Sequence, residues 1–275
     1  MIHKIAIGLA FSPNLKANLF EAIRCANLFN AELIAIHVGY KTTEKTEQLQ
    51  LLLDEAPYLK QPLTTVWKQG NPVSVILETC ERGTIDLLIL GAIQKENLYK
   101  YYVGSIARRL TRKAPCSVLL LIKPSIERVP CQHMIVNGLK DTRTEQTIQY
   151  AIKISKAFEC KRVTIVEEIS QTELAIKVSD DKTLRQATII RERIQQREDL
   201  RIKEILSEID TKGININTQS IFGRCGYSIG HYAKVKHADL LVMNAPLKTR
   251  VLDRLFPHDI EYILSELPTD VLIVK

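Results

Sequence analysis

The sequence predicts an α/β protein with two tandem doubly wound domains, each a five-stranded parallel sheet of order 3-2-1-4-5 with helices on both faces. Short apolar runs alternate with segments of helical periodicity, and the same ordered set of segments occurs twice. The 275 residues are also enough for two domains of average size. Because parallel strands need helix-length crossovers, this alternation favours a parallel sheet.

Three pairs of matching segments define the internal repeat. They are residues 4–9 with 134–139, 85–91 with 238–244, and 114–121 with 267–274. Between the two copies, residues 123–130 carry two prolines and mixed charges, a composition typical of a connection. We therefore expect a first domain at residues 1–127 and a second at 128–275.

The elements of the first copy follow from this alternation. Apolar, β-branched runs predict strands at 4–9, 32–38, 63–68, 86–91 and 117–122, and helical spacing predicts helices at 15–29, 44–55, 72–83 and 103–113. Asn71 places a capping side chain before Pro72, a residue suited to the first helical position. In the second copy, Thr142 and Glu145 have the spacing of a capping box, which predicts a helix start there.

The second copy is longer than the first after its second strand. The extra residues, at about 170–212, combine apolar positions at helical spacing with charged residues on the other faces. Because the phase slips near residues 195–199, we expect either one helix or a helix pair. The main expectation is an amphipathic insertion packed on its own domain, and the alternative is an arm that binds a protein partner.

Composition narrows the classes of partner. The net charge of +7 is dispersed, which suits an anionic small ligand but lacks the clustered stripe that nucleic-acid binding needs, so we do not expect a nucleic-acid partner. The six cysteines form no Cys-x-x-Cys motif, and no leader-like segment or apolar stretch of about 20 residues is present. We therefore expect a cytoplasmic protein without a membrane partner.

Motifs for catalysis and metal binding are absent from the sequence. The histidines show no His-x-x-x-His spacing, and no nucleophile-elbow or Walker-type loop occurs. We therefore expect no catalytic residues and no metal site.

A ligand crevice is expected where the carboxyl ends of the first and fourth strands meet. In this chain these are residues 9–14 and 91–105. Gly104 and Ser105 open the following helix, where backbone N–H groups and the helix dipole favour an anion. A glycine-serine pair is also the ordinary signature of a turn and helix cap, so both interpretations stay open.

Several motifs of the first copy resemble a universal stress protein domain. They are residues 86–91, the Gly104-Ser105 pair, residues 114–120, and Gly70-Asn71-Pro72. The resemblance covers the first copy and, with fewer motifs, the second, so the chain is similar to tandem universal stress proteins. It implies a non-catalytic stress-response regulator, and in some members ATP binding through a Gly-x2-Gly-x9-Gly-Ser/Thr loop.

The resemblance assigns candidate nucleotide-binding residues in the first domain only, for ATP or AMP. They are Gly91, Gln94, Gly104 and Ser105 for the loop, the Val38 backbone for adenine, and Ala10 near the adenosine. Two of these depart from the family pattern. Gln94 stands where the family has its second glycine, and Ala10 where members that bind ATP usually have an aspartate, which removes a hydrogen-bond acceptor.

The second copy departs further from that pattern. Asn244, Leu247, Pro257 and His258 stand at the four loop positions, and Lys140 stands at Ala10. Pro257 lacks the N–H that would face a phosphate. We expect no ATP binding of the family type there; Lys140 and His258 are either a different anion site or simply exposed.

Pairing within the chain is the remaining expectation. In the family the last strand of the sheet pairs across a dimer, so residues 117–122 and 269–274 predict an internal pseudo-dimer, and a homodimer and an unidentified protein partner are further candidates. The leading function is a stress-response regulator that binds ATP or AMP. The alternatives are a nucleotide-independent interaction scaffold, and slow ATP hydrolysis for which no base is evident.

Overall fold

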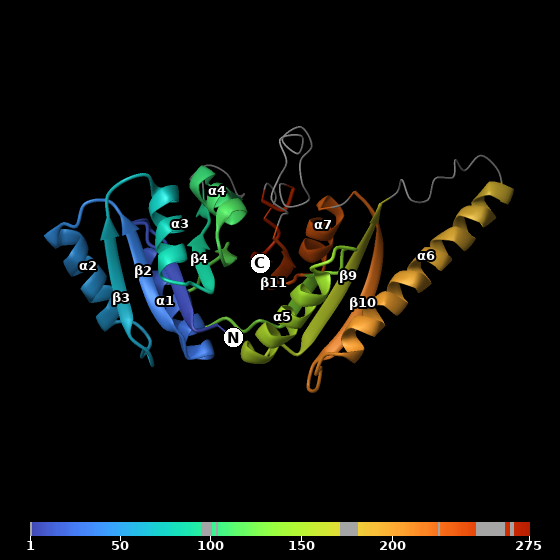
Figure 1. Ribbon diagram of the computed structural model, residues 1–275, viewed down its shortest axis with the longest axis horizontal. Helices are drawn as coiled ribbons and strands as arrows, with labels where there is room; N and C mark the ends of the chain where they lie inside the picture. The colour runs from blue at the N-terminus through green and yellow to red at the C-terminus, as the bar shows by residue number, and fades with distance from the viewer. Residues whose placement is uncertain are drawn as a thin grey trace. The chain divides into compact units, whose positions relative to one another are not determined.

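The computed structural model describes residues 2–94, 101–102, 104–170, 181–224, 226–245, 262–264 and 267–275. The chain divides into two compact units (Figure 1). The first unit comprises the residues up to Pro130 together with Leu264–Lys275, and the second comprises chiefly Cys131–Asn244. The domain boundary near residue 127 stays a prediction, and each unit is described by itself.

The sheet of the first unit has the predicted topology. Its strands are β1 (Lys4–Gly8), β2 (Glu32–Val38), β3 (Leu63–Lys68), β4 (Leu87–Gly91), β7 (Ser117–Leu121) and β12 (Asp270–Val274). The order β3-β2-β1-β4-β7 is parallel throughout and confirms the predicted 3-2-1-4-5. β12, the last strand of the second copy, pairs antiparallel with β7, with Leu272 opposite Leu119.

The helices of the first unit are α1 (Leu15–Phe29), α2 (Thr43–Asp54), α3 (Pro72–Arg82) and α4 (Ser105–Lys113). α3 and α4 lie side by side (Figure 1). The predicted cap of α3 is confirmed, because the Asn71 side-chain oxygen accepts hydrogen bonds from the backbone N–H groups of Val73, at 3.1 Å, and Ser74, at 3.2 Å. Two short strands, β5 (Ile93–Gln94) and β6 (Tyr101–Tyr102), pair antiparallel before α4.

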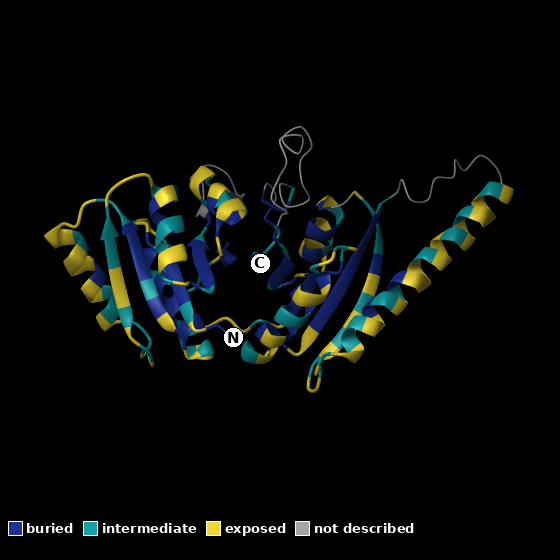
Figure 2. Cartoon of the chain, viewed as in Figure 1, coloured by how far each residue is buried: buried dark blue, intermediate teal, exposed yellow. Residues whose placement is uncertain are grey.

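The core of the first unit lies on the central strands, whose residues are buried from both faces (Figure 2). Ile5, Ile7, Leu88 and Ile89 are completely inaccessible to solvent. Burial of side chains of this size stabilises the fold by about 1.5–3 kcal/mol each. The unbroken apolar runs of the sequence are therefore strands that are covered on both sides.

The second unit repeats the first four strands of the same arrangement. Its elements are β8 (His133–Asn137), α5 (Thr144–Ala157), β9 (Arg162–Ser170), α6 (Asp181–Ser207), β10 (Asn215–Gly223), α7 (Tyr227–Val235) and β11 (Leu240–Asn244). The strands are parallel in the order β10-β9-β8-β11. Its central strand β8 is buried along its whole length.

The predicted capping box of α5 is wrong. The helix begins at Thr144, and no side chain caps its first turn. Instead, the Asp141 carboxylate accepts a hydrogen bond of 2.8 Å from the backbone N–H of Arg143, and the Thr144 hydroxyl donates to the Leu139 carbonyl. A carboxylate in the preceding turn thus replaces the cap that the sequence spacing suggested.

Within the insertion, residues 181–207 form one continuous helix, α6, so the alternative of a helix pair with a break near residues 195–199 is wrong; residues 171–180 lie outside the described residues. The helix packs along β10 (Figure 1). The phase slip near residue 198 arises because Glu198 faces inward and is only 5% exposed, together with the fully buried Ile202. Apolar side chains elsewhere on the helix, including Leu184 and Leu200, remain exposed.

The described part of the chain lacks features of membrane-spanning and metal-binding proteins. None of its helices combines the length and apolar character that crossing a membrane requires. No group of three or more His, Cys, Asp or Glu side chains within it is arranged to hold a metal ion.

Candidate functional site

The candidate crevice of the first unit lies at the carboxyl ends of β1 and β4. Beyond β1, the Leu9 N–H continues the sheet ladder by donating to the Ile36 carbonyl at 2.8 Å. The chain then turns, with the Ser12 N–H bonded to the Ala10 carbonyl at 2.8 Å, and enters α1. Ala10 is therefore an exposed residue just beyond the carboxyl end of β1, and its place in a ligand site stays a prediction.

Gly91 ends β4 against a side chain from α1. A Cβ at residue 91 would lie 2.5 Å from Asn18 Nδ2, so this position accepts only glycine while Asn18 keeps its place. The Asn18 Oδ1 atom is buried and has no hydrogen-bond partner among the described residues. Asn18 was not identified from the sequence, since a lone asparagine within an amphipathic helix carries no signal of its own.

Gly104 occupies the N-cap position of α4, and Ser105 is the first residue of the helix. Its φ of −57° and ψ of 157° are extended values open to any residue, so the glycine is not required by its backbone conformation. No side chain caps the first turn, which holds no acidic residue, whereas Arg112 and Lys113 occupy the last turn. The positive end of the α4 dipole is thus not neutralised by an acidic residue in the first turn of the helix.

The loop between Gly91 and Gly104 is described only in part. The backbone of Gln94 pairs with that of Tyr101 in the β5–β6 ribbon. Residues 95–100 and 103 lie outside the described residues, and no hydrogen bond among the described ones joins Gly91 to Gly104 or Ser105. The structure therefore brings Gly91 to Asn18 and the strand ends, and leaves the closing of the loop as a prediction.

An aromatic cluster borders the same edge of the sheet, over β1, β2 and β3. His37 contacts Phe11 edge to face at 4.9 Å between ring centroids and Trp67 at 4.9 Å. Its Nδ1 donates to the Leu9 carbonyl at 3.1 Å, and its Nε2 accepts from Lys45 at 3.3 Å, a pattern that fits a neutral ring. Val38 follows directly and is partly exposed. The signal that could have found this cluster is the placement of three ring side chains at successive strand ends.

The hydrogen bonds of two aspartates correct the alignment of the two copies by one residue. The Asp86 carboxylate accepts from the N–H groups of His3 and Lys4, and the Asp239 carboxylate accepts from those of Gln132 and His133. Lys4 therefore corresponds to His133, and the counterpart of Ala10 is Leu139. The prediction that Lys140 stands at the Ala10 position is wrong. It aligned Gly8-Leu9 with Gly138-Leu139, and this alignment shifts the register of the two strands by one residue.

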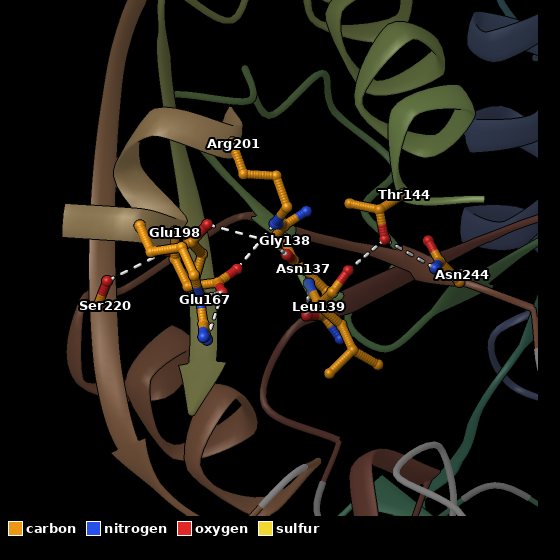
Figure 3. A network of polar contacts seen from close by, with 10 residues as sticks. Asn137, Gly138, Leu139, Thr144, Glu167, Glu198, Arg201, Ser220 and Asn244 are labelled. Carbon is orange, nitrogen blue, oxygen red and sulfur yellow. Dashed lines mark hydrogen bonds and ion pairs between the residues drawn. The ribbon is translucent and has the colours of Figure 1, made fainter. Parts of the chain in front are cut away.

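In the second unit the corresponding strand ends carry a buried ionic network (Figure 3). Glu167 takes the place of His37. His37 follows Ile36, whose carbonyl accepts from the Leu9 N–H, and Glu167 follows Val166, whose carbonyl accepts from the Gly138 N–H. The Arg201 guanidinium, from α6, donates to the Gly138 carbonyl at 2.5 Å, to Glu167 at 3.1 Å and to Glu198 at 2.8 Å. In the first unit the equivalent carbonyl, that of Leu9, bonds His37.

The two glutamates of this network have opposite pKa shifts. Burial raises the pKa of Glu167 to about 7, against the lowering effect of Arg201. Burial acts in the same direction on Glu198, but hydrogen bonds from Arg201 and Arg197 outweigh it and lower the pKa of Glu198. Arg201 is therefore held mainly by an ionised Glu198, and Glu167 is the member of the network that takes up a proton near neutrality.

The remaining predicted residues of the second unit are only partly described. Asn244 ends β11 where Gly91 ends β4, and its amide donates to the Thr144 hydroxyl at 3.3 Å (Figure 3). Leu247, Pro257 and His258 lie outside the described residues. At this edge of the second unit, the Arg201 side chain lies at the strand ends, and the Asn244 side chain stands at the position that Gly91 has in the first unit.

Fold and crevice together define a doubly wound α/β protein with a candidate ligand site at the carboxyl ends of its first and fourth strands. The sequence model of the Universal stress protein family matches residues 1–121. Universal stress protein MJ0531 of Methanocaldococcus jannaschii is 30% identical over 126 residues, which cover 39% of this chain and 74% of that protein. The chain belongs to the universal stress protein family.

Solved structures show the same fold over the full chain. A putative universal stress protein from Pseudomonas aeruginosa has a TM-score of 0.70 at 18% identity, covering 100% of this chain and 93% of that one. A universal stress protein from Archaeoglobus fulgidus has a TM-score of 0.68 at 14% identity, covering 99% and 96%. At these identities the likeness concerns the fold.

Proposed function

We propose that the chain is a non-catalytic stress-response regulator whose first unit binds an adenine nucleotide, ATP or AMP. The observation that carries the proposal is the contrast between the two equivalent sheet edges. The first unit keeps Gly91 at the end of β4, and Gly104 and Ser105 at the start of α4, whereas in the second unit Arg201 bonds the Gly138 carbonyl beyond the first strand. Nucleotide binding is assigned to the first unit for this reason.

The groups around the first edge suit the parts of a nucleotide. The N–H groups at the start of α4, together with the Ser105 hydroxyl, would hold phosphate oxygens. Phe11 and Trp67 offer ring surface near the Val38 backbone, where adenine would lie. Asn18 Oδ1, beside Gly91 and without a partner among the described residues, would accept from a ribose hydroxyl or an amine, a contact that Ala10 cannot make.

Two features weaken the site relative to the family pattern, namely Ala10 and Gln94. Ala10 lacks a side-chain acceptor, a loss that costs roughly 0.5–1.5 kcal/mol, and Gln94 adds a side chain where the family pattern has a glycine. Affinity about tenfold below that of a fully matched site is therefore expected. We propose binding without hydrolysis, since none of the described side chains at this edge is placed as a general base.

Calorimetric titration of ATP and of AMP into the full chain tests the proposal. Trp67 is the only tryptophan and lies at the proposed adenine edge, so its fluorescence gives a second readout. Gly104→Asp, which places a carboxylate where phosphate would lie, is expected to weaken binding at least tenfold. Thr84→Asp introduces the same charge in an exposed turn before β4, at the other end of the strand, and is expected to leave affinity unchanged.

The titration separates the proposal from its competitors. Absence of heat with both nucleotides would exclude the nucleotide proposal, and binding that Gly104→Asp leaves intact would place the site elsewhere. The second candidate function is a nucleotide-independent interaction scaffold. It is favoured by exposed apolar side chains on α6, where Leu184 is 52% and Leu200 59% exposed.

A further inference from the structure

Two cysteines lie opposite each other at the amino ends of β8 and β9. His133 of β8 pairs directly with Arg162 of β9 in a parallel register. Cys131 and Cys160 each precede their paired residue by two positions, so the same register places them side by side. Neighbouring strands are about 4.8 Å apart, which falls within the Cα separation that a disulfide spans.

The two thiols also contact each other. A hydrogen bond joins the side chains of Cys131 and Cys160. This bond is the main cause that lowers the pKa of the Cys160 thiol. Cys160 is 1% exposed, whereas Cys131 is partly exposed. Cys131 is therefore the solvent-accessible residue of the pair, and the buried Cys160 contacts it.

The chain contains a second thiol pair, which differs from the first in that both of its cysteines are buried. A side-chain hydrogen bond also joins Cys80 at the end of α3 to Cys116 before β7. Both of these cysteines are buried, at 1% and 8% exposure. Cys25, inside α1, is buried too, and burial raises the pKa of its thiol to about 12. Among the cysteines that the structure describes, Cys131 is the one that a dissolved oxidant reaches first.

We propose that Cys131 and Cys160 are a redox-active dithiol that a peroxide converts to an intramolecular disulfide, while Cys80 and Cys116 stay reduced. The Cys131 sulfur attacks one peroxide oxygen, the O–O bond breaks, one water leaves, and Cys131 becomes a sulfenic acid. The Cys160 sulfur then attacks the Cys131 sulfur, the S–O bond breaks, and a second water carries off the oxygen and the thiol proton. Two thiols lose two electrons in total, and one peroxide accepts them.

The disulfide would close a loop containing β8 and α5. Such a cross-link restricts the unfolded chain more than the folded one, in which the two residues are already adjacent. We therefore expect oxidation to raise the melting temperature of the chain by several degrees.

Peroxide treatment of the folded chain, followed by alkylation, proteolysis and mass spectrometry, tests the proposal. Cys225→Ser serves as the background, because that cysteine lies outside the described residues. The expected product is a Cys131–Cys160 linked peptide lacking two hydrogens, with Cys80 and Cys116 alkylated only after denaturation. Cys131→Ser and Cys131→Ala are expected to abolish both the link and the rise in melting temperature.

Three results would overturn the proposal. One is recovery of Cys131 and Cys160 as free thiols after all accessible thiols have been oxidised. Another is oxidation of Cys131 to sulfinic acid with no linked peptide. The third is a Cys80–Cys116 link that forms as fast as the other in the folded chain, because exposure of one sulfur would then not be what selects the pair.

Discussion

His37 and Glu167 occupy equivalent positions in the two units and have different partners. His37 bonds the Leu9 carbonyl itself and contacts two aromatic rings edge to face. Glu167 is 2% exposed and needs Arg201 to reach the equivalent carbonyl. A guanidinium from α6 thus supplies, in the second unit, the donor that the His37 ring supplies in the first.

The raised pKa of Glu167 predicts a pH-dependent stability. The ordinary glutamate pKa is 4.5, and that of Glu167 is about 7, so between these values the folded chain binds a proton that the unfolded chain has lost. The free energy of unfolding therefore falls as pH rises through this window. Glu167→Gln imitates the protonated side chain. Its free energy of unfolding, relative to that of the wild type, is therefore expected to increase by about 2–3 kcal/mol from pH 4 to pH 8.

Urea titrations of both proteins at several pH values measure this difference. Glu192→Gln, on the exposed face of α6, is the matched control and is expected to follow the wild-type curve. If Glu167→Gln and wild type keep a constant separation from pH 4 to pH 8, Glu167 does not take up the proton assigned to it.

At the scale of single residues, the sequence predicted element boundaries better than side-chain contacts. Gly91 ends β4, and Gly104 and Ser105 stand at the start of α4, whereas their part in a ligand site stays a prediction. Asn18 and Arg201 could not be predicted, because each reaches the strand ends from a helix whose rotation only packing determines. The one-residue error at Lys140 has a related cause, since repeat matching aligns side-chain types and not hydrogen bonds.

At the scale of elements, two helix starts offer a measurement of capping. Asn71 caps α3 with two hydrogen bonds, whereas Asn14 stands at the N-cap of α1 without any side-chain cap. Asn71→Ala is expected to lower the free energy of unfolding by about 1 kcal/mol, and Asn14→Ala by only a few tenths.

Urea-induced unfolding followed by circular dichroism compares the two variants. Asn71→Asp keeps an acceptor oxygen and is expected to restore most of the loss. Equal losses for the two alanine variants would mean that the Asn71 bonds do not stabilise α3.

The elements of the first copy were predicted closely because local and global signals agree there. Alternating apolar runs, an asparagine-proline start and buried parallel strands all indicate the same boundaries. The insertion was harder, since Glu198 interrupts the apolar spacing of α6. A buried charge is indistinguishable from a break in a helix until its partner, Arg201, is located.

At the scale of the whole molecule, the last strand of the chain completes the first unit. β12 pairs with β7, and the Asp270 carboxylate accepts a hydrogen bond of 2.7 Å from the Ile122 N–H. Val271, Leu272, Ile273 and Val274 are at most 4% exposed. Deletion of residues 270–275 is therefore expected to destabilise the first unit by at least about 5 kcal/mol.

Hydrogen exchange read by mass spectrometry locates this effect. We expect β7 (Ser117–Leu121) to lose protection in the deleted chain earlier than β2, which lies beyond β4 and β1 in the same sheet. Lys212→Ala, in an exposed turn before β10 of the second unit, keeps all of β12 and is expected to exchange like wild type. Unchanged protection of β7 after the deletion would contradict its pairing with β12.

The pairing of β12 with β7 also sets an order of events during synthesis. The ribosome releases β7 early and β12 only after the whole second repeat has emerged, because more than half of the chain separates them. Until then the nascent first repeat presents an apolar strand with an open edge, the kind of surface on which chains aggregate. Translation speed through the second repeat would therefore determine how long the first remains vulnerable.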